Sequence, residues 1–175
     1  MTEDRFWQLI KDARHGDDFY ATLRETLTNE SADDIISFQN ILRRKLVDAY
    51  TFPVLMANFV IQSYVSDDVF EDFRAWLVTQ GRERFESALT NPDSICDWFV
   101  RDDVDGIDGE TMLLICQNAY EQYGDEDEFF EHLHYPPEPT VNQDWPDDKD
   151  GFRDQCPRLV DNFWNQERIK ELHSD

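Results

Sequence analysis

A chain of 175 residues, 40% of them hydrophobic and 14% aromatic, can fold around one core, and its composition excludes a disordered chain. Only 6 glycines and few alternating apolar and polar runs argue against an all-β fold. The net charge of −23 disfavours binding to nucleic acid or an anionic membrane, because both carry negative phosphates.

Apolar residues recur at helical spacing along most of the chain, which predicts an all-α, single-domain bundle of about seven to nine helices. Capping residues and glycines separate the apolar stripes from one another. In chain order, we expect helices over residues 4–14, 19–27, 32–49, 52–61, 67–80, 82–89, 92–100, 112–120 and 157–172. The stretch 52–61 has almost no polar face, so we expect it to be central.

The distribution of proline predicts three parts. Residues 1–135 are expected to form a helical core domain, and residues 101–109 within it an acidic loop. Residues 136–150 contain four prolines and many acids, so they should form an extended connector. Residues 151–175 are expected to carry a C-terminal helix that packs back on the core, because apolar residues return there at helical spacing.

The most complete helix pattern starts at Ser66. The Ser66 hydroxyl can cap the helix, and Asp67 and Asp68 place negative charge at the positive end of the helix dipole. The apolar stripe on this helix consists of Phe70, Phe73, Trp76 and Leu77. Gly81 can adopt the positive φ that ends a helix.

This pattern resembles one family. The matching stretches are Phe6-Trp7-x-Leu9-Ile10, then Ser66-Asp67-Asp68-x-Phe70-x-x-Phe73-Arg74-x-Trp76-Leu77-x-x-Gln80-Gly81-Arg82, then Asn91-Pro92-Asp93-Ser94. They resemble the bacterial family known as domain of unknown function 4240, over roughly residues 3–125. The resemblance implies a mostly helical bacterial cytoplasmic domain, and it implies no reaction.

The acidic charge is concentrated in the second part of the chain. Residues 1–100 hold 18 acids and 10 bases, whereas residues 101–175 hold 21 acids and 6 bases. With aromatic residues that we expect to be exposed at Phe129, Phe130 and Trp145, this pattern favours a basic protein partner. An immunity protein that neutralises a toxin and a mimic of nucleic-acid charge are both compatible with it. The candidate partner-binding residues are Asp67, Asp68, Glu71, Arg74, Asp127, Glu128, Phe129 and Phe130.

A metal-dependent or small-ligand-binding enzyme is the alternative, with carboxylates around Asp67 and Asp103 as its site. The like-charge pairs of residues 67–72 would be stabilised by a cation, although acids at a helix start explain them more simply. Residues 101–112 fail the EF-hand pattern, because Arg101 and Met112 stand where carboxylates are required. His132 and His134 lack a third ligand at a recognised spacing, and they also fit a helix end. We therefore expect no catalytic residue, no metal ligand and no cofactor.

The remaining reactive or charged residues fit structural roles. The three cysteines are odd in number and far apart, which is typical of reduced thiols, and we interpret Cys96 and Cys116 as core residues. The basic clusters, Arg43 to Lys45 and Arg82 with Arg84, should pair with acids in so acidic a chain. The acidic start lacks a signal-peptide pattern, so we expect a cytoplasmic protein.

Overall fold

The computed structural model describes residues 1–137, 139–141 and 143–172, and in these residues the chain is helical and contains no strand. The all-α prediction is confirmed. The described residues form eleven α-helices and two 3-10 helices, more than the seven to nine expected. They are α1 (Glu3–Ala13), α2 (Phe19–Thr28), α3 (Ala32–Asp48), α4 (Phe52–Gln62), α5 (Asp67–Thr79), α6 (Arg82–Thr90), η1 (Pro92–Asp97), η2 (Arg101–Gly106), α7 (Glu110–Tyr120), α8 (Glu126–Glu131), α9 (Lys149–Gln155), α10 (Pro157–Phe163) and α11 (Gln166–Leu172).

The helix starts are fixed by the caps that the sequence indicates. The Ser66 hydroxyl accepts a hydrogen bond from the Val69 backbone N–H at 3.2 Å, and Asp18 and Ser31 cap α2 and α3 in the same way. Gly81 has a φ of 86° and lies between α5 and α6, where a side chain would strain the backbone. Each cap satisfies an amide that would otherwise lack a partner.

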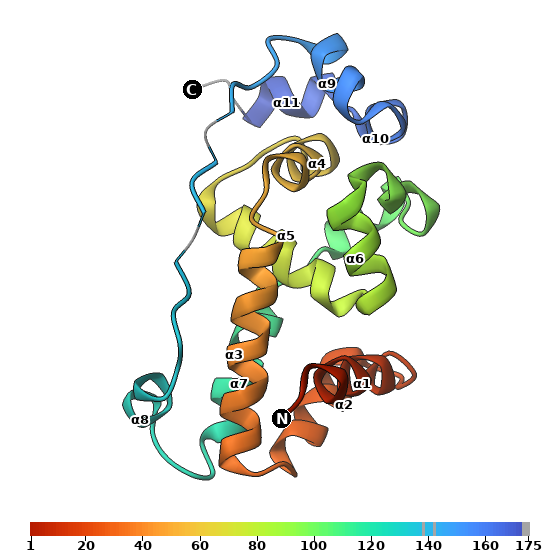
Figure 1. Cartoon of the computed structure of the whole chain (residues 1–175). Coiled ribbons are helices and arrows are strands. Elements are labelled where there is room, and N and C mark those ends of the chain that lie inside the picture. Colours follow the sequence, from red (N-terminus) through yellow and green to blue (C-terminus); the bar gives the residue numbers. More distant parts are fainter. Residues whose placement is uncertain (138, 142, 173–175) are drawn as a thin grey trace.

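The longest helix, α3, forms the axis of the molecule (Figure 1). The helices α5 and α7 pack against it and against each other. In Figure 1, α1 and α2 lie toward one end of α3, and α4 lies beyond the other end, next to α9, α10 and α11. The helix α4 contacts α5 and α6 as well as α9 and α10, which explains its lack of a polar face.

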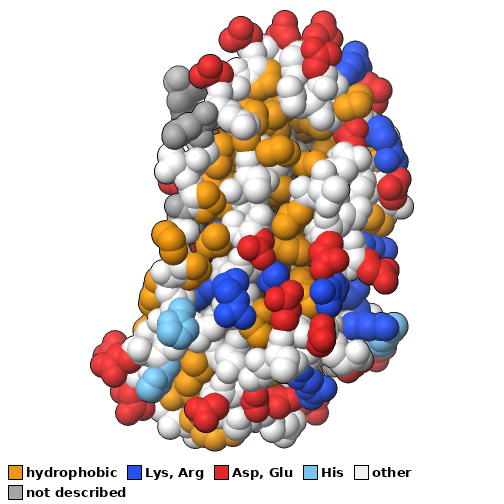
Figure 2. All heavy atoms as spheres, viewed as in Figure 1, with side chains coloured by type: hydrophobic (Ala, Val, Ile, Leu, Met, Phe, Trp, Pro, Cys, Tyr) orange, Lys and Arg blue, Asp and Glu red, His pale blue; other side chains and the backbone are white. Residues whose placement is uncertain are grey.

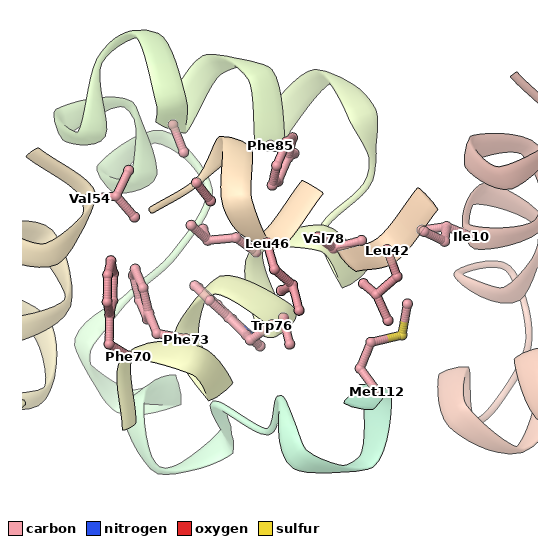
Figure 3. Packing of buried hydrophobic residues seen from close by; sticks show 14 of the residues in the cluster. Ile10, Leu42, Leu46, Val54, Phe70, Phe73, Trp76, Val78, Phe85 and Met112 are labelled. Carbon is pink, nitrogen blue, oxygen red and sulfur yellow. The ribbon is translucent and has the colours of Figure 1, made fainter. Parts of the chain in front are cut away.

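The core combines side chains from the whole length of the chain. Phe70, Phe73 and Trp76 project from successive turns of α5 into the same interior as Leu46 of α3 and Phe85 of α6 (Figure 3). Trp76 is 5% exposed, and its ring centroid lies 4.8 Å from that of Phe99. Burying such aromatic side chains contributes a few kcal/mol each, so this α5 stripe is a main source of stability.

The C-terminal part differs from the prediction. The single helix expected over residues 157–172 is wrong, because α10 ends at Phe163 and α11 begins at Gln166. An additional helix, α9, precedes them. Residues 92–97 and 101–106 form 3-10 helices instead of an α-helix and a loop. The division of the chain at residues 135 and 150 stays a prediction, and residues 138, 142 and 173–175 lie outside the described residues.

Between α8 and α9, the described residues 132–137, 139–141 and 143–148 contain no helix and lie along one side of the molecule (Figure 1). Near the start of this stretch, the Asn40 side-chain oxygen accepts a hydrogen bond from the His134 backbone N–H at 2.7 Å, and the Arg43 guanidinium stacks 4.1 Å from the Tyr135 ring centroid. Near its end, the Trp145 ring packs against Phe52 and Phe59. Among the described residues, no helix is both long enough and apolar enough to cross a bilayer.

Candidate functional site

The candidate residues on α5 have two different environments. Asp67, Asp68 and Glu71 are exposed. The two aspartates lie in the first turn, where their negative charge interacts favourably with the positive end of the helix dipole. Arg74 is instead buried, with 2% of its surface exposed. The three carboxylates can therefore meet a partner, whereas Arg74 lies inside the fold.

The Arg74 side chain ties α5 to α3. Its Nη1 donates to the Leu46 backbone oxygen at 2.9 Å, and its Nε donates to the Phe70 backbone oxygen at 3.2 Å. The guanidinium also lies over the Tyr50 ring, 4.5 Å from the centroid. The Leu46 carbonyl belongs to the last turn of α3, where carbonyls lack helical partners. As a candidate partner-binding residue, Arg74 is thus corrected to a buried structural residue.

Acidic side chains also gather where α5 meets the start of α7. Asp72 is half-buried, and its pKa is raised by burial first and then by repulsion from Glu110, Glu71, Asp108 and Asp68. Asp103 is exposed on η2, and the neighbouring Asp105 lies 3.6 Å from Arg168. Within the part of the chain that the structure describes, no three His, Cys, Asp or Glu residues are placed to hold a metal ion. The metal-dependent or small-ligand-binding alternative stays a prediction.

The second candidate group lies on α8. Asp125 and Glu128 form a capping box, in which each side chain accepts a hydrogen bond from the other residue's backbone N–H. Phe129 is only 2% exposed, and its ring centroid lies 5.2 Å from that of Tyr120. Phe130 is half-buried. The expected exposure of Phe129 is therefore wrong, since this ring anchors the short helix on α7.

The carboxylates of α8 point into solvent. All five acids of residues 125–131 are exposed, and among the described residues none of them forms an ion pair. Figure 2 shows acidic side chains gathered at the lower left, where Figure 1 places α8, and again at the top of the molecule. Their charge is available to a partner because no internal cation neutralises it.

The fold does not unite the two groups in one site. The chain just before α8 contacts the turn that precedes α3, where the Tyr123 hydroxyl donates to the Glu30 backbone oxygen at 2.8 Å. Arg74 of α5 contacts the last turn of the same helix. Because α3 has 17 residues, its two ends are about 25 Å apart. The residues of α5 and α8 therefore form separate surfaces.

The sequence analysis missed the residues that position α8. Asn40 and Gln122 hold the chain on either side of it, through hydrogen bonds to His134 and to the Thr28 backbone oxygen. These contacts join residues more than 90 positions apart, so no local pattern indicates them. The helix ends at Glu131 with His132 as its C-cap, as the alternative interpretation of the histidines predicts.

The cysteines lie mainly in the interior. Cys116 and Cys156 are buried, and burial raises the pKa of the Cys156 thiol to about 12. Cys96 is half-buried and has a raised pKa, also chiefly because of burial. A high thiol pKa disfavours the thiolate, so none of the three has the environment of a nucleophile.

The comparison with protein families identifies the family of this chain. Residues 1–122 match the family described as a protein of unknown function, DUF4240. The chain belongs to this family. No curated protein and no solved structure matches it. The match includes the whole α5 motif but ends before α8, so the acidic surface of α8 belongs to the part of this DUF4240 protein that follows the match.

Proposed function

We propose that this protein is a bacterial cytosolic binding module that presents the acidic surface of α8 to a basic protein partner. The observation that carries the proposal is a capped helix, anchored by the buried Phe129 ring, with five exposed carboxylates in residues 125–131 and no ion pair to them among the described residues. An immunity protein that neutralises a toxin, or a mimic of nucleic-acid charge, would use such a surface.

The anchoring of α8 supports this proposal energetically. The capping box and the buried Phe129 ring fix the helix before binding, so a partner would not have to order it. Uncompensated surface charge accelerates association with an oppositely charged protein. The half-buried Phe130 ring belongs to the same short helix, and its exposed part can add apolar contact area beside the carboxylates.

A charge-removal variant tests the proposal. In Glu126→Gln/Asp127→Asn/Glu131→Gln, three charges are removed while Asp125 and Glu128 keep the capping box. The matched control, Asp17→Asn/Asp102→Asn/Asp154→Asn, removes three exposed charges elsewhere. Both variants and the wild type are immobilised for capture from a lysate of the native host, and retained proteins are identified by mass spectrometry.

The expected result is one basic protein that the wild type and the control retain at low salt and the α8 variant does not. Purified, that protein should bind the α8 variant at least about tenfold more weakly, since several steering and contact charges are lost. Equal retention by all three proteins, or retention of no basic protein, would contradict the proposal.

A further inference from the structure

A second surface has the opposite character. Between α1 and the turn from α5 to α6 lies a cleft of about 580 Å³, a size typical of small-molecule sites. Its charged lining consists of four cations, Lys11, Arg14, Arg82 and Arg84, and two acids, Asp4 and Glu83. In a chain with a net charge of −23, this local excess of positive charge is unusual. Figure 1 shows α6 facing α1 across this region.

Internal ion pairs account for only one of the four cations. Arg82 lies 3.0 Å from Asp4 and 2.7 Å from Glu86. Within the described residues, Lys11, Arg14 and Arg84 form no ion pair. We expected both arginines of the Arg82 and Arg84 cluster to pair with acids, and Arg82 does so. The Arg84 guanidinium instead lies over the Trp98 ring, 5.0 Å from the centroid.

Neutral oxygens hold Arg14 at the wall of the cleft. Its Nη1 donates to the Thr79 backbone oxygen at 2.8 Å and to the Gln80 side-chain oxygen at 3.3 Å. These bonds fix the guanidinium but leave its charge uncompensated. Burial lowers the pKa of Arg14, and repulsion from Arg84 lowers it further. An anion between the two guanidinium groups would relieve that repulsion.

The backbone of the cleft adds to its positive character. Gly81 precedes α6, a helix of 9 residues, and it has no side chain with which to cap the first turn. The first helical bond is donated by the Phe85 N–H to the Gly81 oxygen, so the amides of residues 82–84 lack helical acceptors. The positive φ of Gly81 turns the chain so that this helix start lines the cleft beside Arg14.

We propose that this cleft binds the phosphate group of a small molecule. Three cations without acidic partners, one of them the fixed guanidinium of Arg14, and free amides are the kinds of donor that bind phosphate oxygens. The distant acids weaken such binding little, because charges beyond about 8 Å are largely screened at physiological salt. The site lies away from α8 and goes beyond the protein-binding role proposed above.

The test uses calorimetric titration of the full-length protein at low salt with inorganic phosphate and, separately, with phenyl phosphate. Binding of both probes supports the phosphate site. Tighter binding of phenyl phosphate would identify a phosphorylated metabolite as the source of the group, and equal or weaker binding would identify free phosphate. The proposal is overturned if neither probe binds.

Three single variants locate the binding. Lys11→Gln and Arg84→Gln each remove one cation from the cleft, and each should weaken phosphate binding about tenfold, the loss of one charge-assisted bond. Arg44→Gln removes an exposed cation from α3 outside the cleft and should leave the affinity unchanged. An equal loss in all three would show general charge attraction and overturn the site.

Folding and the separation from α8 are checked in the same experiments. Lys11 is exposed, so Lys11→Gln should keep the unfolding midpoint of the wild type even if loss of the Arg84 stacking destabilises the other variant. The triple α8 variant should bind phosphate as the wild type does. A loss of phosphate binding in that variant would contradict a separate site.

Discussion

Gly109 lies directly against the backbone of Asp72, where the start of α7 meets α5. A Cβ atom at position 109 would overlap the Asp72 carbonyl group and Cα. Backbone cannot move aside as a flexible side chain can, so Gly109→Ala must displace α7. We expect a loss of about 1–3 kcal/mol in the free energy of unfolding, measured by urea denaturation.

Gly106 provides the matched control for this substitution. A Cβ atom there would meet nothing within 4 Å. Gly106→Ala should therefore change the free energy of unfolding by less than about 0.5 kcal/mol. Similar losses in both variants would mean that the contact between Gly109 and Asp72 does not decide the packing of α7.

The buried guanidinium of Arg74 should be necessary for stability. Arg74→Met keeps an unbranched apolar stem but removes the donors to the Leu46 and Phe70 carbonyls. A buried acceptor left without its donor costs free energy, so we expect a loss of roughly 2 kcal/mol in urea denaturation. The exposed Arg44, changed to Met, should show almost no loss, and a fully stable Arg74→Met would argue against the bonds described here.

The pKa of Asp72 gives a prediction with a definite sign. Because the folded-state pKa is raised, the folded protein holds this proton more tightly than the unfolded chain does. The free energy of unfolding therefore falls as the pH rises from the ordinary value of 3.8 through the raised pKa. At neutral pH the ionised Asp72 destabilises the fold.

Asp72→Asn removes this destabilisation. The variant should be more stable than the wild type at pH 7, by less than about 1 kcal/mol because the side chain is partly in water. The advantage should shrink as the pH falls below 3.8, where the wild-type carboxyl is protonated in both states. Asp17→Asn, at an exposed site, serves as the control in the same series of urea titrations.

Trp145 should hold the C-terminal helices on the core. Its ring lies 5.8 Å from Phe52, 5.5 Å from Phe59 and 5.9 Å from Phe152, measured between centroids. Trp145→Ala removes these contacts, so we expect faster amide hydrogen exchange in α9 and α10 and little change in α1 to α3. Leu114→Ala, which truncates another exposed apolar side chain, should leave exchange in α9 and α10 unchanged.

Local signals predicted the N-terminal helices closely. The helix expected to start after Ser66 does so, because a hydroxyl cap and two aspartates act within a single turn. The break after α10 could not be predicted in this way, since Leu159, Val160, Phe163 and Ile169 continue the helical spacing through it. There Arg101 donates to the Asn162 and Trp164 backbone oxygens at 2.9 and 3.3 Å. Arg101 thus donates hydrogen bonds to backbone carbonyls at the end of α10, although it lies about 60 positions earlier in the sequence.

The candidate site also depends on contacts that local sequence patterns do not predict. The acids of α8 are exposed, as their sequence indicates, but the burial of Phe129 depends on contact with Tyr120 across the turn at Gly124. The meeting of Arg14 and Arg84 depends on α1 packing beside the turn at Gly81. Contacts of this kind follow from tertiary packing, which neither spacing nor composition specifies.

The limit of the family match does not coincide with the limit of the packed interior. Phe59 of α4 contacts the rings of Trp145, Phe152 and Trp164, all of which follow residue 122. A fragment cut at residue 122 would leave this aromatic face of α4 in water, and contiguous apolar surface of that kind promotes self-association. Anyone who expresses the shared region alone should therefore expect aggregation, and substituting Phe59 with a polar residue is the first remedy to try.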